Sequence, residues 1–261
     1  MSEFLLRIKY FFFDIDGTLA YGITGIILPE TIATIETLQK NGHFVAIATG
    51  RLQCSAIPQC KILGIQNMVS DGGNALTLHH KIIHMHPLPK QPILNLIAEL
   101  EQNQILWAYT AENKTIRHTK YAKFKELAGP SNMDTLVHSN IEVAAIEEFY
   151  KIYIYYPNLK ELNTLPSLTV LPQIHYNNNM LLIEPTHKEK GIFHMMEYLK
   201  GDLADVVVFG DGINDLSMFR PEWFSVAMGN AIEDLKQKAD FVTKRCEDGG
   251  ITYACQHFGW I

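Results

Sequence analysis

The sequence is poor in the residues that hold small secreted or zinc-bound folds together. It has only four cysteines in 261 residues, and no two of them form a C-x-x-C pair. A zinc knuckle or a disulfide framework is therefore not expected, and we interpret the thiols as small buried or surface side chains. The four are Cys54, Cys60, Cys246 and Cys255. With 47% hydrophobic residues, the chain has enough apolar surface for one large core or two modest ones.

A basic excess and a long apolar run are also missing. The formal net charge is −6, which argues against a general nucleic-acid or anionic-membrane surface. No apolar run approaches the roughly 20 residues that span a bilayer. The apolar segment 4–13 is short and runs into Asp14 without a small-residue cleavage site, so it does not resemble a signal peptide. We expect a soluble, cytoplasmic protein without nucleic-acid or membrane partners; its oligomeric state is not indicated.

Apolar strands alternate with helical patterns at both ends of the chain, which predicts a doubly wound parallel sheet covered by helices. In the first part we expect strands at 10–15, 43–48 and 68–70, and helices from Pro29 and over 52–63, the second broken or kinked at Pro58. In the last part we expect helices at 188–199, 213–219 and 231–237 and strands at 205–209 and 224–228. The predicted core domain is thus discontinuous, comprising 1–80 and 188–261.

The segment between these parts, 81–187, has shorter elements and more polar turns, which predicts an inserted α+β domain. Helices are expected at 89–102, 121–127 and 142–149, and strands at 105–110 and 151–156, the latter half-exposed. Strands at 168–176 and 180–183 should form a hairpin around Asn177-Asn178-Asn179, because asparagine tolerates positive φ. The fold class is therefore α/β, with a doubly wound parallel core sheet and an α+β insert.

Asp14 and Asp16 follow the first predicted strand, at the end where doubly wound sheets bind ligands. Residues two apart on an extended chain point to the same side, so both carboxylates can face one crevice. Their mutual repulsion would be relieved by a cation, and Mg²⁺ prefers oxygen ligands. The alternative is that Asp-x-Asp-Gly-Thr is an ordinary acidic turn.

Two basic or hydroxyl-bearing segments are candidates for binding a phosphate group. Thr49-Gly50-Arg51 follows the second strand, and a hydroxyl in a glycine turn suits a phosphate oxygen. Lys188 precedes a predicted helix and could supply a point charge, although Lys190 competes for this role. Each segment taken alone is also compatible with an ordinary turn or a solvated surface.

A third polar cluster follows the strand 205–209 and reads Gly210-Asp211-Gly212-Ile213-Asn214-Asp215. Two acids and an amide at this position are costly unless something positive binds there. A dinucleotide-binding loop is the competing interpretation, since Gly210 and Gly212 form G-x-G. Asp215 stands where the third glycine would be, however, and its carboxylate would repel a pyrophosphate.

Taken together and in this order, these motifs resemble the haloacid dehalogenase-like superfamily, and within it the Cof-type phosphatases. The resemblance implies a Rossmann-like catalytic core with the insert 81–187 as a cap domain. It also implies a Mg²⁺-dependent phosphatase in which Asp14 attacks phosphorus and forms an aspartyl-phosphate. Asp16 would protonate the leaving oxygen and later activate water. The sequence departs from the family at Asp71-Gly72-Gly73-Asn74-Ala75, where an Asn-Gly-Ala segment is usual, so no role is assigned to Asn74.

The same resemblance implies the remaining ligands. The phosphoryl oxygens would be held by the backbone of Ile15 and by Thr49, Gly50, Lys188 and Asn214. The magnesium ion would be held by Asp14, the backbone carbonyl of Asp16 and Asp211, with Asp215 orienting from behind. The expected substrate is a small phosphorylated metabolite: a sugar phosphate, a nucleotide or a phosphorylated cofactor. A phosphotransferase or mutase, or a non-catalytic phosphometabolite-binding module on the same fold, remains the alternative.

Overall fold

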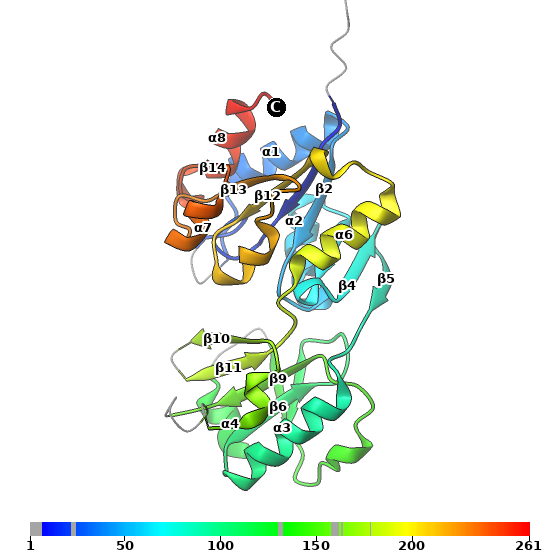
Figure 1. The fold of residues 1–261 in the computed structure, drawn as a ribbon, viewed down its shortest axis with the longest axis vertical. Coiled ribbons are helices and arrows are strands. Elements are labelled where there is room, and N and C mark those ends of the chain that lie inside the picture. The colour runs from blue at the N-terminus through cyan, green and yellow to red at the C-terminus, as the bar shows by residue number, and fades with distance from the viewer. Residues whose placement is uncertain (1–6, 22–24, 130–132, 158–161, 163, 178) are drawn as a thin grey trace, which may run out of the picture. The chain divides into compact units, whose positions relative to one another are not determined.

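The computed structural model describes residues 7–21, 25–129, 133–157, 162, 164–177 and 179–261. The chain divides into two compact units, each with a sheet of its own (Figure 1). The first unit comprises the chain up to Arg51, Ala56–His84 and His187–Ile261, and the second comprises Leu52–Ser55 and Met85–Thr186. In these described ranges, no helix is long and apolar enough to cross a membrane.

The first unit is built on an eight-stranded sheet of order β14-β13-β12-β1-β2-β3-β4-β5. Its strands are β1 Tyr10–Phe13, β2 Phe44–Ala48, β3 Asn67–Ser70, β4 Ala75–Leu78, β5 Lys81–Met85, β12 Val206–Gly210, β13 Phe224–Ala227 and β14 Phe241–Val242. The strands from β14 to β3 pair in parallel, and β4 is antiparallel to β3. Strand β1 lies between β12 and β2, so the strand order reverses direction at β1, where such sheets bind ligands.

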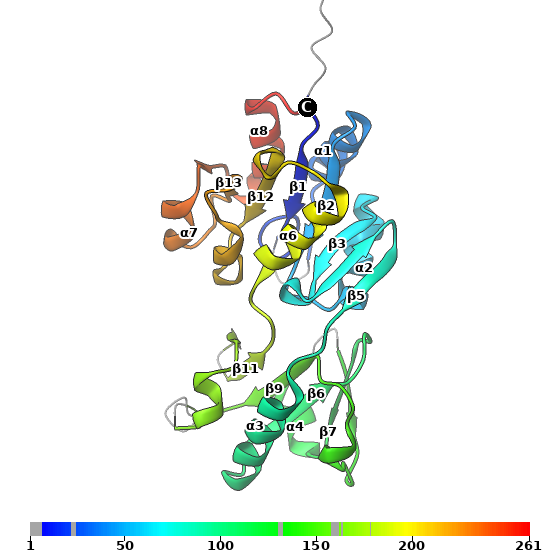
Figure 2. The same cartoon turned by 45° about the vertical axis from the view of Figure 1, so that its right-hand side comes forward.

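Helices cover both faces of this sheet. They are α1 Pro29–Lys40, α2 Gln53–Leu63, α6 Lys188–Leu199, α7 Glu233–Lys238 and α8 Gly250–His257. Because side chains alternate along a strand, Phe11 and Phe13 join the core under α1, α2 and α8, while Phe12 joins the core under α6 and α7. Figure 2 shows α6 lying across one face of the sheet. The predicted fold class, a doubly wound parallel α/β core with an α+β insert, is confirmed.

The second unit contains a six-stranded sheet of order β10-β11-β9-β6-β7-β8. Its elements are α3 Lys90–Gln102, β6 Leu106–Thr110, β7 Ile116–Thr119, α4 Ala122–Leu127, β8 Asp134–Val137, β9 Lys151–Tyr155, β10 Gln173–Asn177 and β11 Met180–Ile183. The pairing is antiparallel except between β7 and β8. Helix α3 packs on Trp107 and Ile154 of one face, and Phe124 of α4 packs on Tyr153 of the other.

Several local predictions differ from the structure. Segment 142–149 contains only the short 3₁₀ turn Val143–Ala145, because its apolar side chains pack against the second unit's core without forming a helix. Strand β9 is mostly buried and not half-exposed, because both sheet faces are covered. Helix α2 is not broken at Pro58, since it continues to Leu63; the alternative expectation, a kink at Pro58, stays a prediction. Only Gln173–Asn177 of the expected strand 168–176 is extended, after a 3₁₀ turn at Pro166–Thr169. Of the predicted hairpin turn, Asn178 lies outside the described residues.

Candidate functional site

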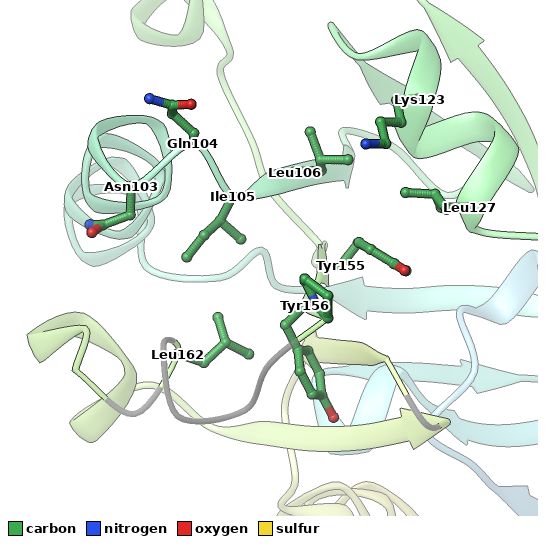
Figure 3. Close-up of a pocket in the computed structure, with 10 residues that line it drawn as sticks. Asn103, Gln104, Ile105, Leu106, Lys123, Leu127, Tyr155, Tyr156 and Leu162 are labelled. Atoms are coloured by element: carbon green, nitrogen blue, oxygen red, sulfur yellow. The ribbon is translucent and has the colours of Figure 1, made fainter.

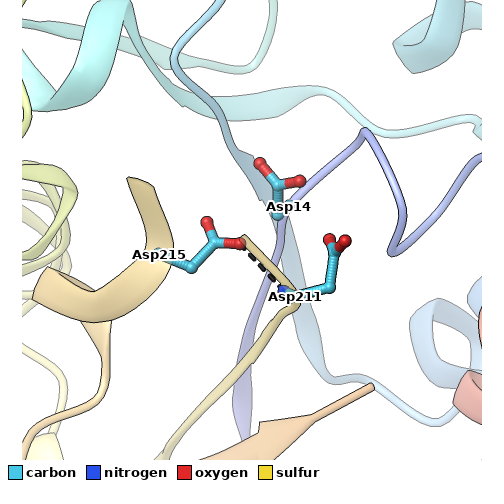
Figure 4. A group of neighbouring side chains, drawn as sticks. All are labelled: Asp14, Asp211 and Asp215. Carbon is cyan, nitrogen blue, oxygen red and sulfur yellow. Dashed lines mark hydrogen bonds between the residues drawn. The ribbon is translucent and has the colours of Figure 1, made fainter. Parts of the chain in front are cut away.

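Three carboxylates meet at the carboxyl ends of the central strands β1 and β12. Asp14 directly follows β1, and its backbone N–H donates to the carbonyl of Phe209 at 3.0 Å, which extends the pairing of the two strands. Asp211 directly follows β12, and Asp215 lies on the 3₁₀ helix η5, Ile213–Met218. Each of the three aspartates offers an oxygen, and these oxygens all lie within 4.8 Å of one another (Figure 4). This is the place that the strand order marks as a ligand site.

Lys188, the first residue of α6, reaches into this group from another part of the chain. Its Nζ donates to Oδ1 of Asp14 and to Oδ1 of Asp215, at 2.6 Å in both cases. The side chain of Lys188 is only 1% exposed, whereas Lys190 is exposed. One ammonium therefore faces three carboxylates, and the group has an excess of negative charge when all three are ionised.

The electrostatics of the group follow from burial and from this charge imbalance. Burial and the neighbouring Asp215 carboxylate raise the pKa of Asp14 well above its usual value, against the opposing effect of Lys188. Burial and Asp215 likewise raise the pKa of Asp211 to about 7. Burial alone would lower the pKa of Lys188, but the carboxylates of Asp14 and Asp215 outweigh it and raise that pKa. The carboxylates are thus held in a place that favours an additional positive charge.

Asp215 is fixed by the backbone as well as by Lys188. Its Oδ2 accepts hydrogen bonds from the backbone N–H groups of Asp211 and Gly212, at 2.9 Å each, and the side chain is fully buried. Gly210 packs so closely that an added Cβ would lie 2.8 Å from the Asp215 carboxyl carbon. Asp215 therefore ties the loop after β12 together and orients Lys188 at the same time.

Asp211 is held by two neutral donors. Thr18 Oγ1 donates to its Oδ1 at 2.9 Å, and Asn230 Nδ2 lies 3.2 Å from its Oδ2. Gly17 has φ +89° and lies so close that a Cβ there would be 2.0 Å from Asp211 Oδ2, so only glycine fits. The sequence reasoning missed Asn230, although it follows β13 at the same edge of the sheet as the other polar loops.

The Asn230 amide also joins this loop to the C-terminal part of the chain. Its Nδ2 donates to the carbonyl of Gly17 at 2.9 Å, and its Oδ1 accepts from the backbone N–H of Cys246 at 2.8 Å. Cys246 Sγ in turn donates to the carbonyl of Thr18 at 3.0 Å. Burial, with the nearby Asp211 carboxylate, raises the pKa of the Cys246 thiol to about 12, so this thiol is protonated and structural.

Asp16 is placed differently from the three grouped aspartates. Its side chain is 61% exposed and forms an ion pair with Arg51, whose Nη2 lies 2.5 Å from Oδ1. Of the predicted phosphate ligands, Thr49 is buried at the end of β2, and its Oγ1 accepts from the backbone N–H of Arg51 at 3.1 Å. That arrangement leaves the Thr49 hydroxyl hydrogen available to a ligand oxygen.

The other predicted ligands lie in the same loops. Gly50 follows β2 beside Thr49, and Asn214 lies half-buried on η5. The side chain of Ile15 is fully buried, which holds the loop after β1 in place. The structure thus brings the predicted residues of the first unit to one edge of its sheet, while their roles remain predictions.

The second unit contains a pocket of about 200 Å³ that is separate from the carboxylate group. Figure 3 shows side chains that line it, from the turn after α3, from α4 and from the end of β9. They are Asn103, Gln104, Ile105, Leu106, Lys123, Leu127, Tyr155, Tyr156, Pro157 and Leu162. None of them was predicted as a site residue, and none belongs to the carboxylate group. The pocket therefore does not carry the chemistry described above.

Comparisons with known proteins agree with this fold. The family of haloacid dehalogenase-like hydrolases matches residues 11–255. The chain is 32% identical over 265 residues to "Putative phosphatase YkrA" of Bacillus subtilis (strain 168), covering 97% of this chain and 98% of that protein. A hypothetical protein from Geobacillus kaustophilus HTA426 has a TM-score of 0.84 at 27% identity, covering 97% and 100% of the two chains. The subclass IIB sugar phosphatase BT4131 has a TM-score of 0.78 at 26% identity, with the same coverage.

The fold and the site define an α/β enzyme with a carboxylate centre at its topological switch point. Because the family match spans most of its length, the protein belongs to the haloacid dehalogenase-like hydrolases. The family and the class of enzyme expected from the sequence motifs are confirmed.

Proposed function

We propose that the protein is a magnesium-dependent phosphatase that hydrolyses a small phosphorylated metabolite through an aspartyl-phosphate on Asp14. The observation that carries this proposal is the buried contact of Lys188 with Asp14 and Asp215 beside Asp211. A carboxylate nucleophile must approach an anionic phosphate ester, which it does only where positive groups offset the charge. Lys188 supplies one such group, and the three carboxylates can hold a second.

The donor set fits a divalent cation that prefers oxygen. Three carboxylates with oxygens within 4.8 Å of one another, and no histidine or cysteine among them, suit Mg²⁺ better than zinc. Asp14, Asp211 and the backbone carbonyl of Asp16 would hold the ion, with Asp215 behind them. When bound, the ion would offset the negative charge that develops on the phosphoryl oxygens.

The residues of the chain divide the reaction into two steps. In the first, a carboxylate oxygen of Asp14 forms a bond to phosphorus, the ester P–O bond breaks, and Asp16 gives a proton to the leaving oxygen. In the second, Asp16 takes a proton from water, which attacks the phosphorus and releases Asp14 and inorganic phosphate. Donors on four segments would hold the phosphoryl oxygens in both steps: the backbone of Ile15, Thr49 with Gly50, Lys188, and Asn214.

The two units suggest separate roles in catalysis and in substrate recognition. The residues proposed for chemistry all lie in the first unit, and we propose residues 1–80 with 188–261 as the catalytic core. The insert 81–187 would act as a cap that contacts the part of the substrate beyond the phosphate. The subclass IIB relative BT4131 is a sugar phosphatase by its printed description, which supports sugar phosphates as the first compounds to test. We place the activity in the cytoplasm.

The proposal is tested with purified protein and p-nitrophenyl phosphate, with and without Mg²⁺, followed by a panel of sugar phosphates, nucleotides and phosphorylated cofactors. We expect turnover that requires Mg²⁺ and is lost in Asp14→Asn. A metal-independent rate, or a rate that Zn²⁺ restores better than Mg²⁺, would contradict the proposed site.

A further inference from the structure

Arg51 and Asp16 form a two-pronged ion pair across two neighbouring loops. Arg51 Nε donates to Oδ2 of Asp16 at 2.9 Å, and Nη2 donates to Oδ1 at 2.5 Å. Asp16 belongs to the loop after β1 and Arg51 to the loop after β2, and these two strands are paired. Both oxygens of the carboxylate are thus engaged by one planar guanidinium, which fixes the direction as well as the distance of the pair.

The backbone of Arg51 is itself held from both sides. Its N–H donates to Thr49 Oγ1 at 3.1 Å, and its carbonyl accepts from the backbone N–H of Asp71 at 2.8 Å. The backbone N–H of Thr49 donates to the carbonyl of Val69 at 2.9 Å. The loop after β3 therefore anchors the point from which the Arg51 side chain extends, while that side chain is only 21% exposed.

An ion pair of this kind contributes little to stability, because the side chain of Asp16 is 61% exposed to water. The ion pair instead fixes the orientation of the Asp16 carboxylate. The Asp16 carboxylate would otherwise rotate freely in solvent, and a group that transfers protons works only within hydrogen-bond reach and at the right angle. A guanidinium cannot take over the proton transfer, since it stays protonated.

We propose that Arg51 is a positioning residue that orients the Asp16 carboxylate for proton transfer to the leaving oxygen. This inference rests on the proposed phosphatase function and deepens it. One oxygen of Asp16 exchanges its bond to Arg51 for the transferred proton, while the other oxygen keeps its bond and holds the carboxylate in place. Arg51 is thereby distinguished from Thr49 and Gly50 of the same segment, which are proposed to contact phosphate.

The test compares Arg51→Ala and Arg51→Lys with wild type on a good leaving group, p-nitrophenyl phosphate, and a poor one, a sugar phosphate that wild type hydrolyses. Arg220→Ala is the matched control, because Arg220 grips Glu222 through the same two nitrogens, at 3.1 and 2.8 Å. For Arg51→Ala we expect kcat on the sugar phosphate to fall roughly tenfold and kcat on p-nitrophenyl phosphate to fall less. KM and inhibition by orthovanadate should stay unchanged, and added guanidinium should restore part of the rate. Arg51→Lys can contact Asp16 through only one nitrogen, so its kcat should lie between those of wild type and Arg51→Ala.

A double-mutant cycle makes the test decisive. In an Asp16→Asn background, Arg51→Ala should have no further effect, because the group it orients no longer transfers protons. A raised KM, weaker orthovanadate inhibition and equal losses for both substrates would make Arg51 a phosphate ligand and overturn the inference. Unchanged kinetics in Arg51→Ala would reduce the pair to a surface contact and also overturn it. If wild type itself showed no Mg²⁺-dependent hydrolysis, the proposed function would fail and the inference with it.

Discussion

Lys188 Nζ lies 2.6 Å from Oδ1 of Asp14, although the two residues are 174 positions apart in the chain. The contact joins the start of α6 to the end of β1 and is completed by Asp215, which accepts from the same ammonium. A buried lysine between two carboxylates is costly to assemble as structure alone, since a well-packed apolar group would often be as stable. This cost supports our proposal that the contact is part of a reaction centre.

The first prediction separates the two candidate lysines. Lys188→Met keeps an unbranched apolar side chain as far as Cε but removes the charged ammonium, so kcat/KM should fall by roughly 100-fold or more. Lys190→Met is the matched control, because Lys190 is exposed and lies on the same helix. It should keep nearly all activity. The measurement is steady-state kinetics, with circular dichroism as a check on folding. A larger loss of kcat/KM in Lys190→Met than in Lys188→Met would assign the phosphate-binding role to Lys190.

The second prediction concerns pH and metal. The folded protein raises the pKa of Asp211 from 3.8 to about 7 through burial and Asp215, so it binds this proton more tightly than the unfolded chain does. The associated stability is present in full below about pH 4 and is lost as pH rises towards 7. If Mg²⁺ binds here as we propose, it would replace the lost proton as the positive charge. The rise in melting temperature on adding Mg²⁺ should therefore be larger at pH 7.5 than at pH 5.

Asp211→Asn serves as the control for that measurement, because other groups also titrate over this range. In metal-free samples, the melting temperature of wild type should fall relative to that of Asp211→Asn as pH rises from 4 to 7. An equal effect of Mg²⁺ at both pH values, measured by scanning fluorimetry, would show that the ion does not bind at this carboxylate group.

The third prediction concerns Asn230, which holds Asp211 through an amide. Removing a group that orients a metal ligand typically weakens metal affinity or activity by about 10- to 100-fold. Asn230→Ala should therefore raise the Mg²⁺ concentration for half-maximal activity by at least roughly tenfold. Asn41→Ala is the comparison, since the Asn41 amide donates only to the carbonyl of Trp260 in the part of the chain that the structure describes. An identical Mg²⁺ requirement in both variants would assign Asn230 a purely structural role.

Much of the first unit could be predicted because its signals are local. The aromatic run before Asp14 predicts β1, and the pattern after His187 predicts α6 with the bounds that the structure has, Lys188–Leu199. Polar residues that follow apolar strands also mark the correct edge of the sheet. The contact of Lys188 with Asp14 could not be predicted from the sequence, because it depends on how distant segments come together in space.

The sequence-based predictions are wrong or incomplete where tertiary packing, and not the local sequence pattern, determines the structure. Segment 142–149 has a helical pattern, yet its backbone stays largely irregular while Ile146 and Phe149 pack against the core of the second unit. Asn230 was missed because a single asparagine after a strand has no distinctive spacing. The bond between Arg51 and Asp16 was missed for a similar reason, since a lone arginine in a turn gives no indication of its partner.

The most direct test of the account is to trap the phosphorylated enzyme. Asp16→Asn should slow breakdown of the aspartyl-phosphate, so a ³²P-labelled aryl phosphate mixed with this variant and quenched in acid should leave label on the protein. We expect one hydroxylamine-sensitive label on the peptide that contains Asp14, since this variant has no carboxylate at position 16 that could carry it, and no label in Asp14→Asn. Turnover without a trapped label, together with more than about 1% of wild-type activity in Asp14→Asn, would contradict it.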